Sequence, residues 1–240
     1  RAGLRRELER TNALAPRDFA ARLALARLLL LEGEKEKVTE QLVVLNELSP
    51  DHPDVLRLKI SLAQVQGDQE TGSALLADVF KTSPSTASML SVARQKWAMG
   101  EQAASLKLQE QWTEEHPDDL TAMLALAAAY SQQDQVEPAF VQFQKVLEKD
   151  EQNVVALNGL AWHLRNKQPA RALEYAQRAV KLAPESPQVM DTLAVVQLNN
   201  GQVKRAHRSI ERAYEKTPQD PAVRYHYAMI DAAAGNKTAA

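Results

Sequence analysis

The chain has 240 residues and 45% hydrophobic content, which is enough to bury a sizeable core, so disorder is not expected. Its 29 lysines and arginines nearly balance its 31 aspartates and glutamates, and the net charge of -2 gives no general positive field to hold nucleic acid or an anionic membrane. There is no cysteine, which excludes disulfides, thiolate metal sites and cysteine nucleophiles.

In chain order, the first predicted element is a charged helix over residues 1–14, which lacks the apolar segment of a signal peptide. Because the chain begins at Arg1 and not at methionine, we expect a fragment or a processed product of a longer protein. The longest apolar runs, such as residues 122–130, are far shorter than the roughly 20 residues that span a bilayer. No transmembrane helix is therefore predicted.

From residue 16 onward, proline and glycine recur with a period of about 34 residues. The prolines that keep this period are Pro16, Pro50, Pro84, Pro117, Pro184 and Pro218. The glycines that keep it are Gly33, Gly67, Gly100, Gly201 and Gly235, and Asp134 stands where another glycine is expected. A third series marks the middle of each unit and is small except at its second member: Ala26, Ile60, Ala93, Ala127, Ala161, Ala194 and Ala228. So regular a period indicates a repeat array and not a single closed core.

Within each period the apolar residues recur at three and four positions, as at Val189, Leu193 and Val196, which is the spacing of a helix. Pro187 suits the first turn of such a helix, and Gly201 supplies the positive φ that ends it. Each unit is therefore predicted to be a helix, a tight turn and a second helix. The first helices are expected near residues 19–31, 53–66, 86–98, 119–133, 153–166, 187–200 and 221–234, and the second near 35–48, 69–82, 102–115, 136–149, 169–182 and 203–216, with another beginning at 237–240.

The unit that carries Ala194, Gly201, Ala206, Ile210, Ala213 and Pro218 resembles the tetratricopeptide repeat at each of these positions. This resemblance implies an all-α fold, a right-handed superhelical solenoid of about six to seven helix-turn-helix repeats. It predicts one solenoid over residues 1–240, cut from a longer array. The expected full repeats are 17–50, 51–84, 85–117, 118–151, 152–184 and 185–218, with partial repeats at 1–16 and 219–240.

A narrower resemblance covers residues 158–234, which include the phrases NGLAWHL, ARALEYAQRAVKLAPESPQVMDTLA and VRYHYA. Their order is similar to the tetratricopeptide-repeat lipoprotein of the PEP-CTERM and exosortase system of exopolysaccharide-producing bacteria. Where that family often has Gly-Trp, this chain has Ala194 and Val195. The resemblance implies a periplasmic scaffold with a lipid anchor upstream. A scaffold of another export system and a cytoplasmic adaptor are the alternatives.

The tetratricopeptide resemblance also implies that the inner face of each first helix lines a concave groove. We expect the partner-binding residues on that face to be Arg27, Arg57, Arg94, Trp97, Asn158, Trp162, Arg165, Asp191 and Tyr225. In one interpretation the arginines bind carboxylates or carbonyls of an extended protein segment, and the aromatic rings give it rigid apolar area. In the other, the arginines pair with neighbouring acidic residues and the aromatic rings fill gaps between units.

The five histidines are scattered over different units and are expected to be surface residues. No metal site, no cofactor and no catalytic residue is predicted, because the sequence has no P-loop, dinucleotide or nucleophile-elbow motif. The predicted function is a non-catalytic scaffold for a protein or peptide partner, without nucleic-acid binding. The alternative of another class is the regulatory region of an enzyme whose catalytic domain lies outside this chain.

Overall fold

The computed structural model describes residues 2–235, and the regular structure in this part of the chain is entirely helical. Its fourteen helices confirm the all-α prediction, and their bounds lie within two residues of the expected ones. They are α1 (Ala2–Leu14), α2 (Phe19–Glu32), α3 (Lys35–Leu48), α4 (Pro53–Gln66), α5 (Gln69–Thr82), α6 (Thr86–Ala98), α7 (Gln102–Glu115), α8 (Leu120–Gln132), α9 (Val136–Lys149), α10 (Val154–Leu164), α11 (Pro169–Leu182), α12 (Pro187–Asn199), α13 (Val203–Lys216) and α14 (Pro221–Ala233).

Five of the six turns inside the repeats, from α2 to α13, contain a residue in the left-handed backbone region, and the turn between α10 and α11 is the exception. Gly33, Gly67, Gly100 and Gly201 have φ values between 72° and 81°, as their spacing predicted. Asp134, which stands in the expected place of a glycine, is the one non-glycine residue of positive φ in the described chain, at 54°. Most L-residues are strained there because Cβ crowds the backbone. The turn between α8 and α9 is therefore built like the others, with a less suitable residue.

The turns between repeats place proline at the first position of several helices. Pro53, Pro169, Pro187 and Pro221 begin α4, α11, α12 and α14. Proline costs little at this position because the first N–H groups of a helix have no partner within the helix. Several other helices begin after a side chain that accepts a backbone N–H, such as Asn153, which accepts from Ala156 N before α10.

The chain divides into two compact units between Leu108 and Gln109. In the first unit, α2, α3 and α4 share a core that includes Ala26, Leu29, Val38, Leu45 and Val55, all nearly or fully buried. Each helix there packs mainly against its neighbours in the sequence, and α2 also contacts α4. This is the packing of a helical repeat array, in which contacts are local along the chain.

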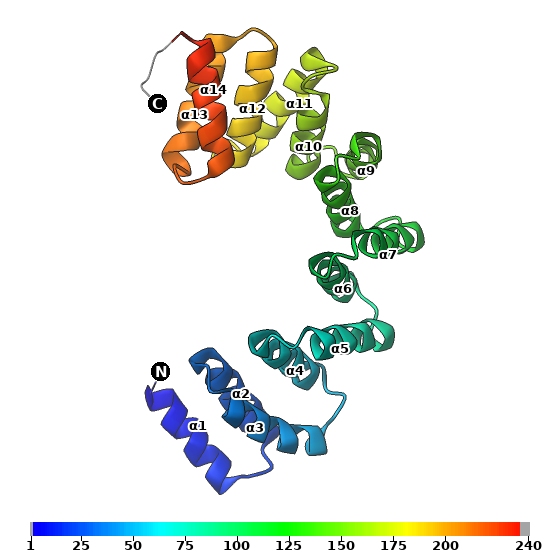
Figure 1. Ribbon diagram of the computed structural model, residues 1–240, viewed down its shortest axis with the longest axis vertical. Helices are drawn as coiled ribbons and strands as arrows, with labels where there is room; N and C mark the ends of the chain where they lie inside the picture. Colours follow the sequence, from blue (N-terminus) through cyan, green and yellow to red (C-terminus); the bar gives the residue numbers. More distant parts are fainter. Residues whose placement is uncertain (1, 236–240) are drawn as a thin grey trace. The chain divides into compact units, whose positions relative to one another are not determined.

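The second unit has a continuous series of smaller cores between successive helices. One core joins α8, α9 and α10 through Ala127, Ala139, Val146 and Leu160, and another joins α12, α13 and α14 around Ile210. Figure 1 shows α12, α13 and α14 side by side, as their contacts require. The first helices α10, α12 and α14 also contact one another in pairs, α10 with α12 and α12 with α14. These contacts place α10, α12 and α14 next to one another, so that each contributes one face to a common surface.

Among residues 2–235, no helix is both long enough and apolar enough to cross a membrane. The helix expected to begin at residues 237–240 lies outside the described residues. The predicted repeat boundaries and the single solenoid stay predictions.

The strained turn at Asp134 can be tested by substitution. We expect Asp134→Gly to raise the free energy of unfolding by about 0.5–1 kcal/mol, because relief of left-handed strain exceeds the added flexibility of glycine. Gly201→Ala, where no atom lies within 4 Å of the added Cβ, should instead lower it by about 1 kcal/mol through backbone strain alone. Urea unfolding followed by circular dichroism measures both. A neutral or destabilising Asp134→Gly would contradict the strain at this turn.

Candidate functional site

A cleft with a volume of about 680 Å³ opens in the second unit over the alternate helices α10, α12 and α14. Four of the residues predicted from the sequence line it: Asn158, Trp162, Asp191 and Tyr225. They come from three helices that are separate in the sequence, and the contacts of α12 with α10 and α14 bring them together. The cleft is therefore the candidate site.

Trp162 and Arg165 form a stacked pair at the C-terminal end of α10. The guanidinium carbon of Arg165 lies 3.8 Å from the centroid of the indole ring, and the guanidinium also donates to Trp162 O at 2.6 Å. Burial lowers the pKa of Arg165 from its ordinary value, although a guanidinium keeps its charge in proteins. The stack covers part of the indole with a cation and fixes the ring in place.

Asp191 and His226 link α12 to α14 across the cleft. His226 Nδ1 donates to the carboxylate and lies 2.9 Å from each oxygen. Both side chains are largely covered, with 12% of Asp191 and 13% of His226 exposed. The Trp162 ring is tilted toward the imidazole, with 5.7 Å between the ring centroids. The pair thus holds the two helices in position and sets one wall of the cleft.

His163 and Ser131 link α10 to α8 in a similar way. Ser131 Oγ donates its hydrogen to Ala127 O at 2.7 Å. His163 Nε2 lies 2.8 Å from Ser131 Oγ and therefore acts as the donor to that hydroxyl oxygen. Burial lowers the pKa of His163, and the nearby charge of Arg165 lowers it further. His163 is therefore kept neutral near pH 7, with the proton on Nε2.

Gly159 allows α9 and α10 to approach closely beside the cleft. A Cβ atom at this position would lie 2.5 Å from the Phe143 ring, nearer than any real packing contact. Phe143 is buried and also lines the cleft. The ring therefore fills the space that a side chain at position 159 would take.

Asn158 and Tyr225 complete the cleft in different ways. The side-chain oxygen of Asn158 is buried and has no hydrogen-bond partner among the described residues. Tyr225 is 67% exposed, and its ring meets that of His226 edge-on at 5.7 Å. One residue thus gives the cleft an unused acceptor, and the other gives its rim an accessible aromatic surface.

The remaining predicted residues lie in the first unit and do not form a comparable site. Arg27 and Arg57 both pair with Asp54, at 2.7 and 3.1 Å, which lowers the pKa of that carboxyl group. Arg94 is exposed and Trp97 is half-buried on α6. The two arginines of α2 and α4 thus make the pairing with a neighbouring acidic side chain that the alternative interpretation expects, and their role in partner binding stays a prediction.

The expectation of surface histidines is wrong for His163, His207 and His226. His163 and His226 line the cleft, and His207 Nε2 lies 3.1 Å from the buried Asp231 Oδ1. Sequence reasoning missed them because their partners lie on other helices, 32 residues away for His163, 35 for His226 and 24 for His207. The sequence signal that could have found such a contact is a histidine and an acidic residue at corresponding positions of the first helices of successive units, as at Asp191 and His226.

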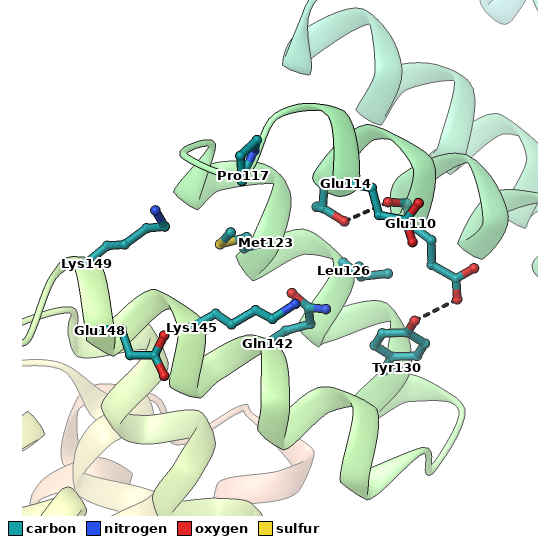
Figure 2. Close-up of a pocket in the computed structure, with 11 residues that line it drawn as sticks. Glu110, Glu114, Pro117, Met123, Leu126, Tyr130, Gln142, Lys145, Glu148 and Lys149 are labelled. Atoms are coloured by element: carbon teal, nitrogen blue, oxygen red, sulfur yellow. Dashed lines mark hydrogen bonds between the residues drawn. The ribbon is translucent and has the colours of Figure 1, made fainter.

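A second cleft of about 560 Å³ lies between α7, α8 and α9 (Figure 2). The Tyr130 hydroxyl donates to Glu110 Oε1 at 2.6 Å, and burial, together with that carboxylate, raises the pKa of Tyr130. Figure 2 shows Lys145 and Lys149 on α9 facing the space between the helices. Its acidic and basic residues nearly balance, and its one aromatic hydroxyl is already bonded, so it offers less for recognition than the α10–α14 cleft.

Comparisons with known proteins agree with this architecture. Residues 163–230 match the tetratricopeptide repeat family, and no curated protein sequence matches the chain. A crystal structure of a tetratricopeptide repeat protein from Parabacteroides merdae is similar with a TM-score of 0.66 at 18% identity, over 91% of this chain and 88% of that one. MamA from Desulfovibrio magneticus is similar with a TM-score of 0.53 at 16% identity, over 62% of this chain and 84% of that one. A chain of the Cut9–Hcn1 hetero-tetramer of APC/C is similar with a TM-score of 0.62 at 12% identity, over 95% of this chain and 45% of that one.

The described residues form an all-helical repeat array, and part of it matches the tetratricopeptide repeat family in sequence. The family match covers residues 163–230, and the structural matches, at these low identities, extend the fold but not a function to the rest. These matches carry nothing specific to an exosortase lipoprotein. The broader of the two predicted resemblances is therefore confirmed.

The contact of Gly159 with Phe143 gives a test of the packing that supports the cleft. Gly159→Ala should lower the free energy of unfolding by about 1–3 kcal/mol, because the new methyl group overlaps a buried ring. The matched control is Gly72→Ala in the first turn of α5, where the nearest atom is Ala63 Cβ at 3.8 Å. That change should stabilise by about 0.5–1 kcal/mol through helix propensity. Equal effects of the two substitutions in urea unfolding would contradict the close approach at Gly159.

Proposed function

We propose that this chain is a non-catalytic protein-binding scaffold and that the α10–α14 cleft accepts a segment of its partner. One observation carries the proposal. Four residues that the repeat pattern assigned to a binding face, Asn158, Trp162, Asp191 and Tyr225, line a single cleft. A set of side chains that served only to fill gaps between units would have no reason to share one opening.

The cleft has the size and chemistry of a recognition site. Its 680 Å³ falls within the range of about 300–1,000 Å³ that is typical of ligand sites. Aromatic residues such as Trp162 and Tyr225 supply large contact area and lose little conformational freedom on binding. The Asp191–His226 and Ser131–His163 contacts hold the walls in place, so less ordering is needed when a partner binds.

The structural neighbours support a role in protein assembly. Cut9, whose fold is similar over 95% of this chain, was crystallised as a hetero-tetramer with Hcn1. Nucleic-acid binding is disfavoured, because Asp191 and Asp220 line the cleft and no lysine or arginine in the described part of the chain does. The regulatory region of an enzyme with its catalytic domain elsewhere stays the alternative of another class.

For the setting, we propose the bacterial cell envelope and exopolysaccharide machinery, on the phrases within residues 158–234 alone. Another export system and a cytoplasmic adaptor are the competing settings. We expect the full-length protein to fractionate with membranes and to lose that location when an upstream lipid-anchor cysteine is replaced. Recovery of the full-length protein only in the cytosol would contradict the envelope setting and leave the scaffold function intact.

Partner capture at the cleft can be tested with a photocrosslinking residue. Benzoylphenylalanine in place of Tyr225 should give a discrete crosslinked product in extract of the native host, because this exposed ring lies at the rim of the cleft. Adding Trp162→Ala should reduce that product several-fold by removing the main apolar wall. Mass spectrometry of the crosslinked band identifies the partner.

Val155 gives the matched control, since it is 58% exposed on α10, does not line the cleft and tolerates a large side chain. Benzoylphenylalanine at Val155 should not give the same product. Identical products from both positions, or a yield that is unchanged by Trp162→Ala in a variant of unchanged helicity, would place partner binding elsewhere.

A further inference from the structure

The α10–α14 cleft is lined by one unpaired amide oxygen and two carboxylates, all of which are hydrogen-bond acceptors. Asn158 Oδ1 is buried without a partner in residues 2–235. Asp191 and Asp220 line the same opening, and no lysine or arginine of residues 2–235 does. The Asp191 carboxylate also accepts from His226 Nδ1 at 2.9 Å. Asp220 also caps α14, and its Oδ1 accepts from Ala222 N at 2.8 Å and Val223 N at 3.3 Å. A buried acceptor gains most from an occupant that donates hydrogen bonds.

The apolar part of the cleft suits the same kind of occupant. Trp162 and Tyr225 present ring surfaces, and aromatic faces attract ammonium and guanidinium groups. Within the chain itself, a guanidinium already stacks on Trp162 at 3.8 Å. Aliphatic stems of basic side chains also pack well on apolar walls while their charged ends reach acceptors.

Arg165 carries a permanent positive charge and stacks on the lining residue Trp162, so it argues for an acidic occupant instead. It is not among the residues that line the cleft, however, and its guanidinium is committed to the Trp162 ring and to Trp162 O. On the other side stand two lining carboxylates and one unpaired amide oxygen. Asp191 also bonds His226 and Asp220 also caps α14, but each keeps its negative charge toward the opening. Charge and hydrogen-bonding capacity therefore both favour a cation.

We propose that the α10–α14 cleft binds a lysine or arginine side chain of the partner protein, with its charged end between Asn158, Asp191 and Asp220 and its stem against Trp162. This inference rests on the proposed function, because it names the chemistry of the segment that the scaffold accepts. The partner segment is accordingly basic at the point of contact, with apolar neighbours that lie on Tyr225.

The test uses capped single residues as probes of the whole chain. N-acetyl-L-arginine methylamide and N-acetyl-L-lysine methylamide should shift the nuclear magnetic resonance signals of the Asn158 side-chain amide and the Trp162 indole N–H. N-acetyl-L-norleucine methylamide has a similar apolar stem without the charge and should bind at least about tenfold more weakly. Added salt should weaken the cationic probes and leave the norleucine probe nearly unchanged.

Two variants remove charge and keep the local structure. Asp191→Asn retains an oxygen that can accept from His226, and Asp220→Asn retains a good helix cap. Each should weaken arginine-probe binding several-fold. The control Glu174→Gln makes the same change of charge at an exposed position of α11 that does not line the cleft, and it should have no effect.

The outcomes separate this inference from the proposed function. Equal binding of the norleucine and arginine probes, or preferential binding of N-acetyl-L-glutamate methylamide, would overturn the basic-side-chain inference. If that happens while the Tyr225 crosslink still depends on Trp162, the scaffold function stands with a different partner chemistry. If the crosslink also fails, the cleft is not the docking site.

Discussion

The fold depends on how closely successive helices approach, and small residues set that distance. Ala127, Ala161 and Ala194 occupy corresponding places in α8, α10 and α12, and all three are fully buried. Because an alanine side chain ends at Cβ, the next helix can lie against the backbone with few intervening atoms. The helix that packs against this alanine is the second helix of the same pair, which also contributes buried alanines such as Ala172 and Ala206. Each first helix thus buries two faces against its sequence neighbours and keeps a third face for its counterparts one repeat away.

The cleft is a direct result of that third face. Asp191 and His226 are 35 residues apart, and Ser131 and His163 are 32 apart, so each contact joins positions about one repeat apart. Residues one period apart in the sequence therefore become neighbours in space, and the alternate helices α10, α12 and α14 place corresponding positions along one wall. The aromatic, acidic and amide groups are therefore close because of the repeat spacing, without any long-range folding of the chain.

Most of the fold could be predicted from the sequence because its determinants are local. Glycine and proline fix the turns through their own backbone geometry, and even the replacement at Asp134 kept the positive φ that the spacing required. The face that holds Asn158, Trp162 and Asp191 could also be predicted, from the resemblance to the tetratricopeptide repeat. The burial of His163 and His226, and the stacking of Arg165 on Trp162, could not. These depend on distances between helices and on rotamers, which a single sequence does not specify.

The Ser131–His163 contact shows why chemistry cannot be assigned from proximity alone. A serine 2.8 Å from an imidazole nitrogen beside a cleft resembles a nucleophile with its general base. Here, however, the serine proton is directed to Ala127 O, one helical turn earlier, and the imidazole must donate to the hydroxyl. A base in that tautomer cannot take the serine proton unless both hydrogen bonds rearrange. Because burial and Arg165 also lower the pKa of His163, the imidazole is a poor proton acceptor, and the contact serves to join α8 to α10.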